Sequence, residues 1–431
     1  MRPFPATLLV CLFLLTSPVL AQWPQWGGPS RNFVITSARL GRTWPAGGPP
    51  VLWRRALGEG HSAVVADDGR LYTMYRPLGL LSLVRRSQEE VIVALDAATG
   101  NTLWEHWYPA PTAGLDFQEG AGPHVTPLVV VGRLFTASSR KELFALDTRS
   151  GKLLWSHDLS SEFGAPLFDR GYASSPIAFG EIVIVQVGGP QGAMAFDQAT
   201  GHVVWRSPAF DDAPASPVLI DVEGQTQVVV FGANEVVGLD PASGGGLWSH
   251  PHRTNWGLNI STPVWGDDNL LLLSSAYNAG TRVLRLARSG DRTTAEERWY
   301  SNRMRVHIGS VVRIGDHAYG SSGDFGPAFL TAVNVKSGEE AWRDRSFARA
   351  QLLYAGDLLL VILDEDGTLG LATVSPQGLQ VLARTQVLSS LAWTPPTLAG
   401  TRLYVRDRKE IVALDLGARG VRSHARSGDP R

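Results

Sequence analysis

Cysteine is almost missing from this chain. The 431 residues include a single cysteine, Cys11, which lies in an apolar stretch close to the N-terminus. One cysteine forms no internal disulfide. If that stretch is cleaved off, the remaining chain has no thiol nucleophile and no cysteine ligand for a metal.

The chain also has almost no net charge. The 39 Lys and Arg residues are balanced by 40 Asp and Glu residues, which leaves a formal net charge of −1. Binding to the phosphates of a nucleic acid requires a basic face, so we expect no nucleic-acid partner. The apolar run from Leu8 to Leu15 is too short to cross a bilayer, and we expect no membrane-spanning segment.

The two ends of the chain differ from the rest. Arg2, the apolar run and the small-residue sequence Val19-Leu20-Ala21 have the pattern of a secretory signal peptide over residues 1–21, cleaved near Ala21. This predicts a periplasmic or secreted location. Residues 417–431 carry arginines among Gly, Ser and Pro, which predicts a flexible tail.

What the chain does contain is a motif that returns about every 40–51 residues. Its fullest form is Ala94-x-Asp96-x-x-Thr99-Gly100-x-x-x-Trp104, and four more copies keep the Asp or Asn eight residues before the Trp. An apolar run precedes each copy and predicts a strand, while Asp-x-x-Thr-Gly is typical of a hairpin turn. Self-similarity on this scale indicates a solenoid, a propeller or an array.

Four short strands per repeat, with no helical periodicity between them, predict an all-β fold of propeller blades. Complete, degenerate and truncated copies together number eight. The last copy, which ends at Asp415, lacks an outer strand, and the unpaired strand around Trp53 can supply it. We therefore predict one eight-bladed propeller of four-stranded antiparallel blades over residues 22–416, closed by an N-terminal strand.

The repeat resembles that of the pyrroloquinoline quinone (PQQ) propeller superfamily. Two segments, Trp23-Pro-Gln-Trp26-Gly-Gly and Trp393-Thr-Pro-Pro, are similar to the bacterial PQQ-binding-like β-propeller repeat proteins, and the resemblance covers about residues 23–416. One branch of the superfamily contains quinoprotein dehydrogenases, which hold PQQ and Ca²⁺. The other is non-catalytic and includes an envelope propeller lipoprotein that assists outer-membrane protein assembly.

The resemblance implies that the repeat tryptophans dock between neighbouring blades, where a buried indole ring stabilises the junction. These structural residues are Trp53, Trp104, Trp155, Trp205, Trp248, Trp299 and Trp342. The sequence also departs from the two branches of the superfamily at one point each. The adjacent cysteine pair of the alcohol dehydrogenases is absent, and Cys11 lies too early to be the lipid-bearing cysteine of the lipoprotein.

Ligand-binding residues are expected in the loops that join the outer strand of one blade to the inner strand of the next. These loops line the mouth of the central channel in a propeller. Their candidate residues are His61, Asp116, His124, Tyr172, Trp256, Asn259, Arg305, His307, Gln351 and Trp393. Trp can stack on a planar ligand, Arg can pair with carboxylates, and Asn or Gln can orient it, so an anionic ligand or a sugar suits this set.

No catalytic residue is assigned, because no Ser-His-Asp set can be selected from the sequence and the histidines lack metal-ligand spacing. We expect a non-catalytic binding or scaffold protein of the cell envelope, monomeric and without cofactor, which holds an envelope protein or a small anionic or sugar ligand. The alternative is a small PQQ-dependent dehydrogenase that oxidises an alcohol or a sugar, with calcium beside the quinone.

Overall fold

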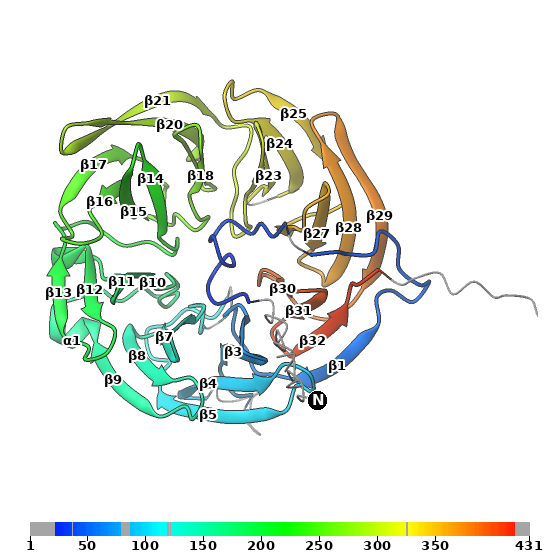
Figure 1. Cartoon of the computed structure of the whole chain (residues 1–431), viewed down its shortest axis with the longest axis horizontal. Coiled ribbons are helices and arrows are strands. Elements are labelled where there is room, and N and C mark those ends of the chain that lie inside the picture. Colours follow the sequence, from blue (N-terminus) through cyan, green and yellow to red (C-terminus); the bar gives the residue numbers. More distant parts are fainter. Residues whose placement is uncertain are drawn as a thin grey trace, which may run out of the picture.

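The computed structural model describes residues 22–36, 38–78, 87–118, 120, 122–324 and 326–418. The predicted signal peptide and residues 419–431 of the predicted tail lie outside the described residues. Within the described ranges, eight four-stranded antiparallel sheets are arranged around a central axis (Figure 1). The predicted eight-bladed propeller is confirmed.

Seven blades each consist of four consecutive strands, which run in order from the innermost to the outermost. Blade 1 is β2 (Val65–Asp67), β3 (Arg70–Tyr75), β4 (Glu89–Asp96) and β5 (Thr102–Pro109). Blade 2 is β6 (Leu128–Val130), β7 (Arg133–Ala137), β8 (Glu142–Asp147) and β9 (Leu153–Asp158). Blade 3 is β10 (Ile177–Phe179), β11 (Ile182–Gln186), β12 (Ala193–Asp197) and β13 (Val203–Arg206). Blade 4 is β14 (Val218–Val222), β15 (Gln225–Phe231), β16 (Glu235–Leu239) and β17 (Gly246–Pro251).

The second half of the ring repeats this order. Blade 5 is β18 (Val264–Gly266), β19 (Leu270–Ser275), β20 (Gly280–Ser289) and β21 (Arg292–Ser301). Blade 6 is β22 (Val312–Ile314), β23 (His317–Ser322), β24 (Phe329–Asn334) and β25 (Glu340–Asp344). Blade 7 is β26 (Gln351–Tyr354), β27 (Leu359–Leu363), β28 (Thr368–Ser375) and β29 (Gly378–Gln386). Blade 8 contains β30 (Thr397–Ala399), β31 (Arg402–Arg406) and β32 (Glu410–Asp415).

The outer strand of blade 8 comes from the other end of the chain. Strand β1 (Val51–Ala56) pairs antiparallel with β32, with Trp53 opposite Ala413 and Ala56 opposite Glu410. The closure predicted from the unpaired Trp53 strand is therefore confirmed. It joins the first and last parts of the chain in one sheet, so the ring has no open blade.

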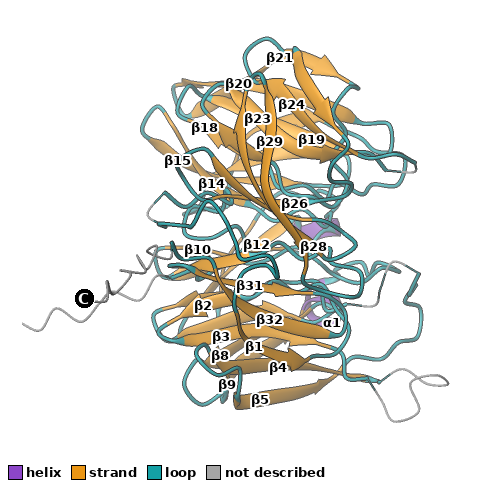
Figure 2. Ribbon diagram, turned by 90° about the vertical axis from the view of Figure 1, so that its right-hand side faces the viewer, coloured by secondary structure: helices purple, strands orange, loops and turns teal. Residues whose placement is uncertain are grey.

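Helix is nearly absent from the described residues. Helix α1 (Leu159–Phe163) follows β9, capped by the Asp158 carboxylate, which accepts from the backbone N–H groups of Ser160 and Ser161. A 3₁₀ turn, η1 (Gly189–Gln191), lies between β11 and β12. Figure 2 shows the ring from the side, with strands crossing its thickness and helix confined to short pieces. No helix in the described ranges is long and apolar enough to cross a membrane.

The motif turn is held by local hydrogen bonds. In the first copy, Asp96 Oδ1 accepts from the backbone N–H groups of Ala98 and Thr99 at 3.0 and 2.8 Å and from the Thr99 hydroxyl at 2.9 Å. The hydroxyl hydrogen bond is the largest influence that lowers the pKa of Asp96. Gly100 follows at φ 75°, a conformation in which a residue with a Cβ is strained.

A bulge directs the motif tryptophan toward the next blade. In blade 1 the register shifts so that Trp104 lies opposite Ala94 and Thr102 opposite Leu95, which leaves Leu103 unpaired. The Trp104 indole donates to the carbonyl of Thr148 in blade 2 at 2.9 Å, and its ring packs over Gly151 of that blade's turn. The junction is therefore built from one indole and the turn of the next blade.

Six of the seven predicted docking tryptophans donate in this way to the residue that follows the motif Asp, or its substitute, in the next blade. The pairs are Trp53 with Ala97, Trp104 with Thr148, Trp155 with Gln198, Trp205 with Pro241, Trp299 with Val335, and Trp342 with Ser375.

Trp248 differs from this prediction. Its indole donates to Oε1 of Gln227 in its own blade at 2.7 Å. The reason lies in one sequence change. Gly238 replaces the motif alanine, and a Cβ there would lie 2.0 Å from the Trp248 nitrogen, so the ring lies over its own blade. In blade 5, Gly290 has no atom within 4 Å of where its Cβ would be, so no ring covers that turn.

The N-terminal segment, residues 22–36, runs across the centre of the ring (blue in Figure 1). It forms an antiparallel bridge with blade 1 and hydrogen bonds with blades 2, 3, 5 and 7. Its contacts are Trp23 with Ala66, Pro24 with Val129, Arg31 with Pro176, Trp26 with Thr262, and Ile35 with Tyr354. We call residues 22–36 the channel segment. Beyond it, Gly41 donates to Leu416 in blade 8 at 2.7 Å.

Arg31 anchors the channel segment to blade 3. Only 4% of the residue is exposed, and its guanidinium donates to the carbonyl of Pro176 at 2.9 Å and to Gln25 Oε1 at 3.1 Å. Burial lowers the pKa of Arg31 to about 9. A cation is buried at such a position only when carbonyl and amide oxygens replace its water.

Candidate functional site

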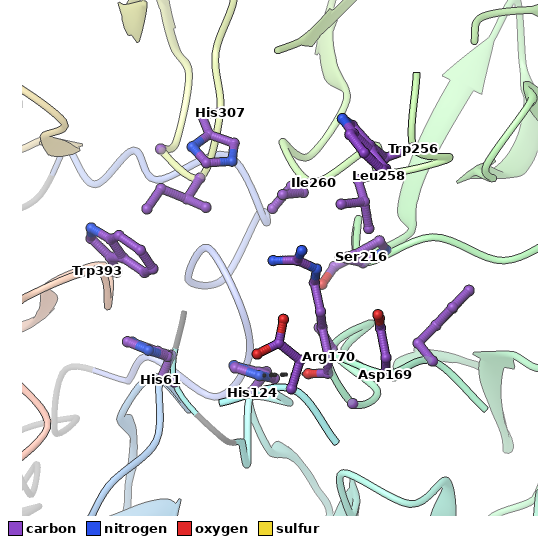
Figure 3. Close-up of a pocket in the computed structure, with 18 of the residues that line it drawn as sticks. His61, His124, Asp169, Arg170, Ser216, Trp256, Leu258, Ile260, His307 and Trp393 are labelled. Carbon is purple, nitrogen blue, oxygen red and sulfur yellow. Dashed lines mark hydrogen bonds between the residues drawn. The ribbon is translucent and has the colours of Figure 1, made fainter. Parts of the chain in front are cut away.

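A pocket of about 330 Å³ opens at one mouth of the central channel. Most of its walls come from the loops between an outer strand and the next inner strand, and Tyr277 comes from the turn between β19 and β20. We call this side of the ring the loop face. The channel segment contributes Trp26 to the same pocket. That segment crosses the centre of the ring (Figure 1), and Figure 3 shows side chains that line the pocket.

Three aromatic rings stack along one wall. The rings of His61 and His124 are parallel within 4° at a centroid distance of 5.5 Å, and His61 stacks on Trp393 at 5.5 Å. His124 Nε2 lies 3.1 Å from the carbonyl of Arg170, so this nitrogen carries the proton. Burial lowers the pKa of His124 to about 4, and the ring is neutral at neutral pH.

His307 lies on the opposite wall as a second neutral imidazole. Its Nε2 pairs with the hydroxyl of Tyr277. Burial, together with the charge of Arg349, lowers the pKa of His307 to about 4. These two histidines therefore add ring surface and polar atoms to the pocket and no positive charge at neutral pH.

Arg170 is the cation among the described lining residues. Figure 3 shows its side chain reaching from the loop after α1 into the space between the walls. Its guanidinium makes no hydrogen bond or ion pair with any residue that the structure describes, whereas that of Arg31, buried in the channel segment, donates to the carbonyl of Pro176 and to Gln25 Oε1. A guanidinium without an intramolecular partner can pair with an anionic ligand.

Two carboxylates accompany this cation, Asp116 and Asp169. The backbone N–H of Asp116 donates to the carbonyl of Asp169 at 2.5 Å, which ties the loop after β5 to the loop after α1. Asp116 Oδ1 accepts from the backbone of Gln118 at 2.9 Å. Among the described lining residues, the charged groups at neutral pH are thus one cation and two anions.

This donor set does not fit PQQ with calcium. Ca²⁺ takes six to eight oxygen ligands, but the described residues contain no group of three or more His, Asp or Glu side chains that could hold a metal ion. The three carboxylates of the quinone would meet a single guanidinium and two like-charged side chains.

Six of the ten predicted channel-mouth residues line the pocket: His61, Asp116, His124, Trp256, His307 and Trp393. The other four are engaged elsewhere. Tyr172 donates to the carbonyl of Gln186, and Asn259 Nδ2 donates to the carbonyl of Gly232. Gln351 Nε2 donates to the carbonyls of Ile308 and Trp393, and Arg305 lies 3.8 Å from Asp324.

Sequence reasoning missed several lining residues, above all Trp26, Asp169 and Arg170. Trp26 belongs to no repeat, and its only signal was the Trp-Pro-Gln-Trp segment after the predicted signal peptide. Asp169 and Arg170 lie in a loop that was predicted to reach the channel mouth, but they share that loop with other polar residues.

Residues 88–344, more than half of the chain, match the family described as outer membrane protein assembly factor BamB. The chain belongs to this family. No curated protein matches the chain significantly. The predicted resemblance to PQQ-like propellers is confirmed.

Solved structures of two kinds are similar to this BamB-family propeller. BamB from Moraxella catarrhalis is 17% identical with a TM-score of 0.58, and the match covers 86% of this chain and 98% of that one. Quinohemoprotein alcohol dehydrogenase from Comamonas testosteroni is 14% identical with a TM-score of 0.64, covering 93% and 81%. A europium-containing methanol dehydrogenase is 13% identical with a TM-score of 0.61, covering 91% and 89%. Identities this low show a shared fold.

Proposed function

We propose that this protein is a non-catalytic binding propeller of the cell envelope, whose loop-face pocket holds part of an envelope protein or a small ligand. The observation that carries the proposal is a preformed aromatic pocket in which the guanidinium of Arg170 has no partner among the residues that the structure describes. Among the described residues, no group of three or more His, Asp or Glu side chains that could hold a metal ion accompanies this guanidinium. Such a site is equipped for recognition, because apolar walls supply affinity and a few polar groups supply orientation.

The exposure of Trp256 supports recognition at the loop face. The residue is 70% exposed at the lip of the pocket, although burial of an indole is strongly favourable. Exposed large aromatic side chains beside a pocket are typical of binding sites. Membership of the BamB family supports a protein partner and an envelope location, and the predicted signal peptide supports the periplasm or secretion.

The dehydrogenase function is the competing proposal, and the stacked wall of His61, His124 and Trp393 favours it, since a planar quinone could lie against such rings. The small number of carboxylates in the described lining argues against a dehydrogenase. Asp116 is a lining carboxylate that could take the proton of a substrate, but the described residues contain no group of three or more His, Asp or Glu side chains that could hold a metal ion.

A reconstitution experiment separates the two functions. Purified protein is incubated with PQQ and Ca²⁺, and reduction of an electron-accepting dye is followed with alcohols and sugars. We expect no substrate-dependent reduction. Calcium-dependent oxidation that is lost in Asp116→Asn would overturn the non-catalytic proposal.

A crosslinking experiment tests binding directly. A photoreactive amino acid is placed at Trp256 and, as a control, at Val131, which is 86% exposed in the turn between β6 and β7 on the opposite face. We expect discrete crosslinked products in envelope fractions from position 256 and none from position 131. Equal crosslinking from both faces would contradict a role for the loop face.

A further inference from the structure

The charges of the pocket indicate a narrower class of ligand. Arg170 supplies a guanidinium without an intramolecular partner among the described residues, and Asp116 and Asp169 supply two carboxylates to the same lining. The half-buried histidines His124 and His307 have pKa values lowered to about 4 and are neutral at neutral pH. A ligand that fills this pocket therefore meets both signs of charge at close range.

The loops that carry these groups are held in place by hydrogen bonds. Asp116 N–H donates to the carbonyl of Asp169 at 2.5 Å, and the ring of His124 donates to the carbonyl of Arg170 at 3.1 Å. Two consecutive peptide groups are thus fixed by the neighbouring loop. Charged groups on a fixed backbone lose little entropy on binding, which favours specific recognition of a small molecule.

The remaining wall is apolar. Trp256, Leu258 and Ile260 come from the loop after β17, Ile308 from the loop after β21, and Trp26 from the channel segment. Figure 3 shows Leu258 and Ile260 across the pocket from His61 and His124. The volume of about 330 Å³ lies at the small end of ligand pockets.

These features discriminate among ligand classes. A polyanion would be repelled by the two carboxylates, and a purely apolar molecule would cover the guanidinium of Arg170 without giving it a partner. A ligand with one anionic group, one cationic group and an apolar body can pair with the guanidinium, pair with the carboxylates and pack against the apolar wall. We propose that the pocket binds a small zwitterion of the α-amino acid type with an aromatic side chain, its carboxylate on Arg170 and its ammonium group on Asp116 and Asp169. This inference rests on the proposed binding function.

Calorimetric titration of the full-length mature protein tests the inference with three matched probes: L-phenylalanine, 3-phenylpropionate without the ammonium group, and 2-phenylethylamine without the carboxylate. We expect L-phenylalanine to bind about tenfold or more tightly than either analogue, because each analogue leaves a charged group unpaired.

Variants test separately the binding of the carboxylate by Arg170 and the binding of the ammonium group by the two aspartates. Arg170→Gln should weaken L-phenylalanine and 3-phenylpropionate about tenfold and leave 2-phenylethylamine unchanged. Asp116→Asn combined with Asp169→Asn should weaken the two amines and leave 3-phenylpropionate no weaker. Arg298→Gln is the matched control, since this exposed arginine lies on β21 and pairs with Glu296, and it should change none of the affinities.

Two outcomes would overturn the inference. Tighter binding of 3-phenylpropionate than of L-phenylalanine would show an anion site, and absence of binding by all three probes would exclude the ligand class. If no probe binds but position 256 still forms crosslinks, the proposal of a zwitterionic ligand is rejected and the proposed partner-binding function stands. Oxidation with PQQ and calcium would instead remove the proposed function.

Discussion

The contact between a docking tryptophan and the turn glycine of the next blade can be measured with one pair of alanine substitutions. Gly151 has φ 70°, and a Cβ added there would lie 2.5 Å from Cε3 of Trp104. Gly290 has nearly the same backbone conformation, φ 62°, with no atom within 4 Å of the added Cβ. Alanine therefore has the same unfavourable backbone conformation at both positions, but only at Gly151 does its Cβ collide with a tryptophan ring.

The expected magnitudes follow from these two terms. Alanine in the left-handed region costs about 1–2 kcal/mol of folding free energy. Overpacking against a rigid neighbour costs about 1–3 kcal/mol more, because the indole must move away from the Thr148 carbonyl to which it donates. Gly290→Ala should therefore destabilise by about 1–2 kcal/mol, and Gly151→Ala by about 2–5 kcal/mol.

Urea unfolding followed by circular dichroism measures both variants, provided that each shows one transition with an unchanged slope. In a Trp104→Ala background, Gly151→Ala should cost only the backbone term, since the blocking ring is gone. Equal destabilisation by Gly151→Ala and Gly290→Ala in the wild-type background would refute the claim that indole and glycine are packed together.

Three further outcomes are expected. Deletion of residues 22–36 should lower the midpoint of thermal unfolding, because inner-strand backbone groups lose their partners; an unchanged midpoint would show that the channel segment adds nothing to the ring. Lys141→Met should cost about 3–5 kcal/mol in urea unfolding because it leaves the fully buried Asp212 without its 2.7 Å partner, and Asp212→Leu should recover much of this loss in the double variant. Burial lowers the pKa of His252 to about 3, so the unfolded chain takes up this proton first as the pH falls from about 6.5. The stability that the neutral ring contributes above pH 6.5 is lost progressively toward pH 3, and His252→Phe should flatten that slope in urea titrations at several pH values; an identical slope would contradict the assignment.

The local parts of the fold could be predicted because their causes are local. Asp96, Thr99 and Gly100 form their turn within five residues, so the motif alone predicts the hairpin. Repetition of that hairpin predicts the blades. The missing outer strand of the last copy and the spare strand around Trp53 predict the closure between β1 and β32.

The pocket could be predicted only to the level of its loops. Once eight blades are assumed, connectivity places every outer-to-inner loop at one mouth of the channel, which is why His61, His124 and Trp393 were found. It does not determine where a side chain points. Asn259 and Gln351 turn away from the pocket because buried carbonyls need donors, and that demand arises only when the loops pack.

By itself, the sequence determined the number of blades, the turn chemistry and the order of the strands, because each depends on residues a few positions apart or on simple counting. The tertiary structure decided that Trp248 packs on its own blade, that the channel segment crosses the ring and brings Trp26 into the pocket, and that Arg170 lacks an intramolecular partner among the described residues. These features join parts of the chain that are far apart. They depend on space left by absent atoms, such as the missing Cβ of Gly238, and on which polar groups are already satisfied when the ring is closed.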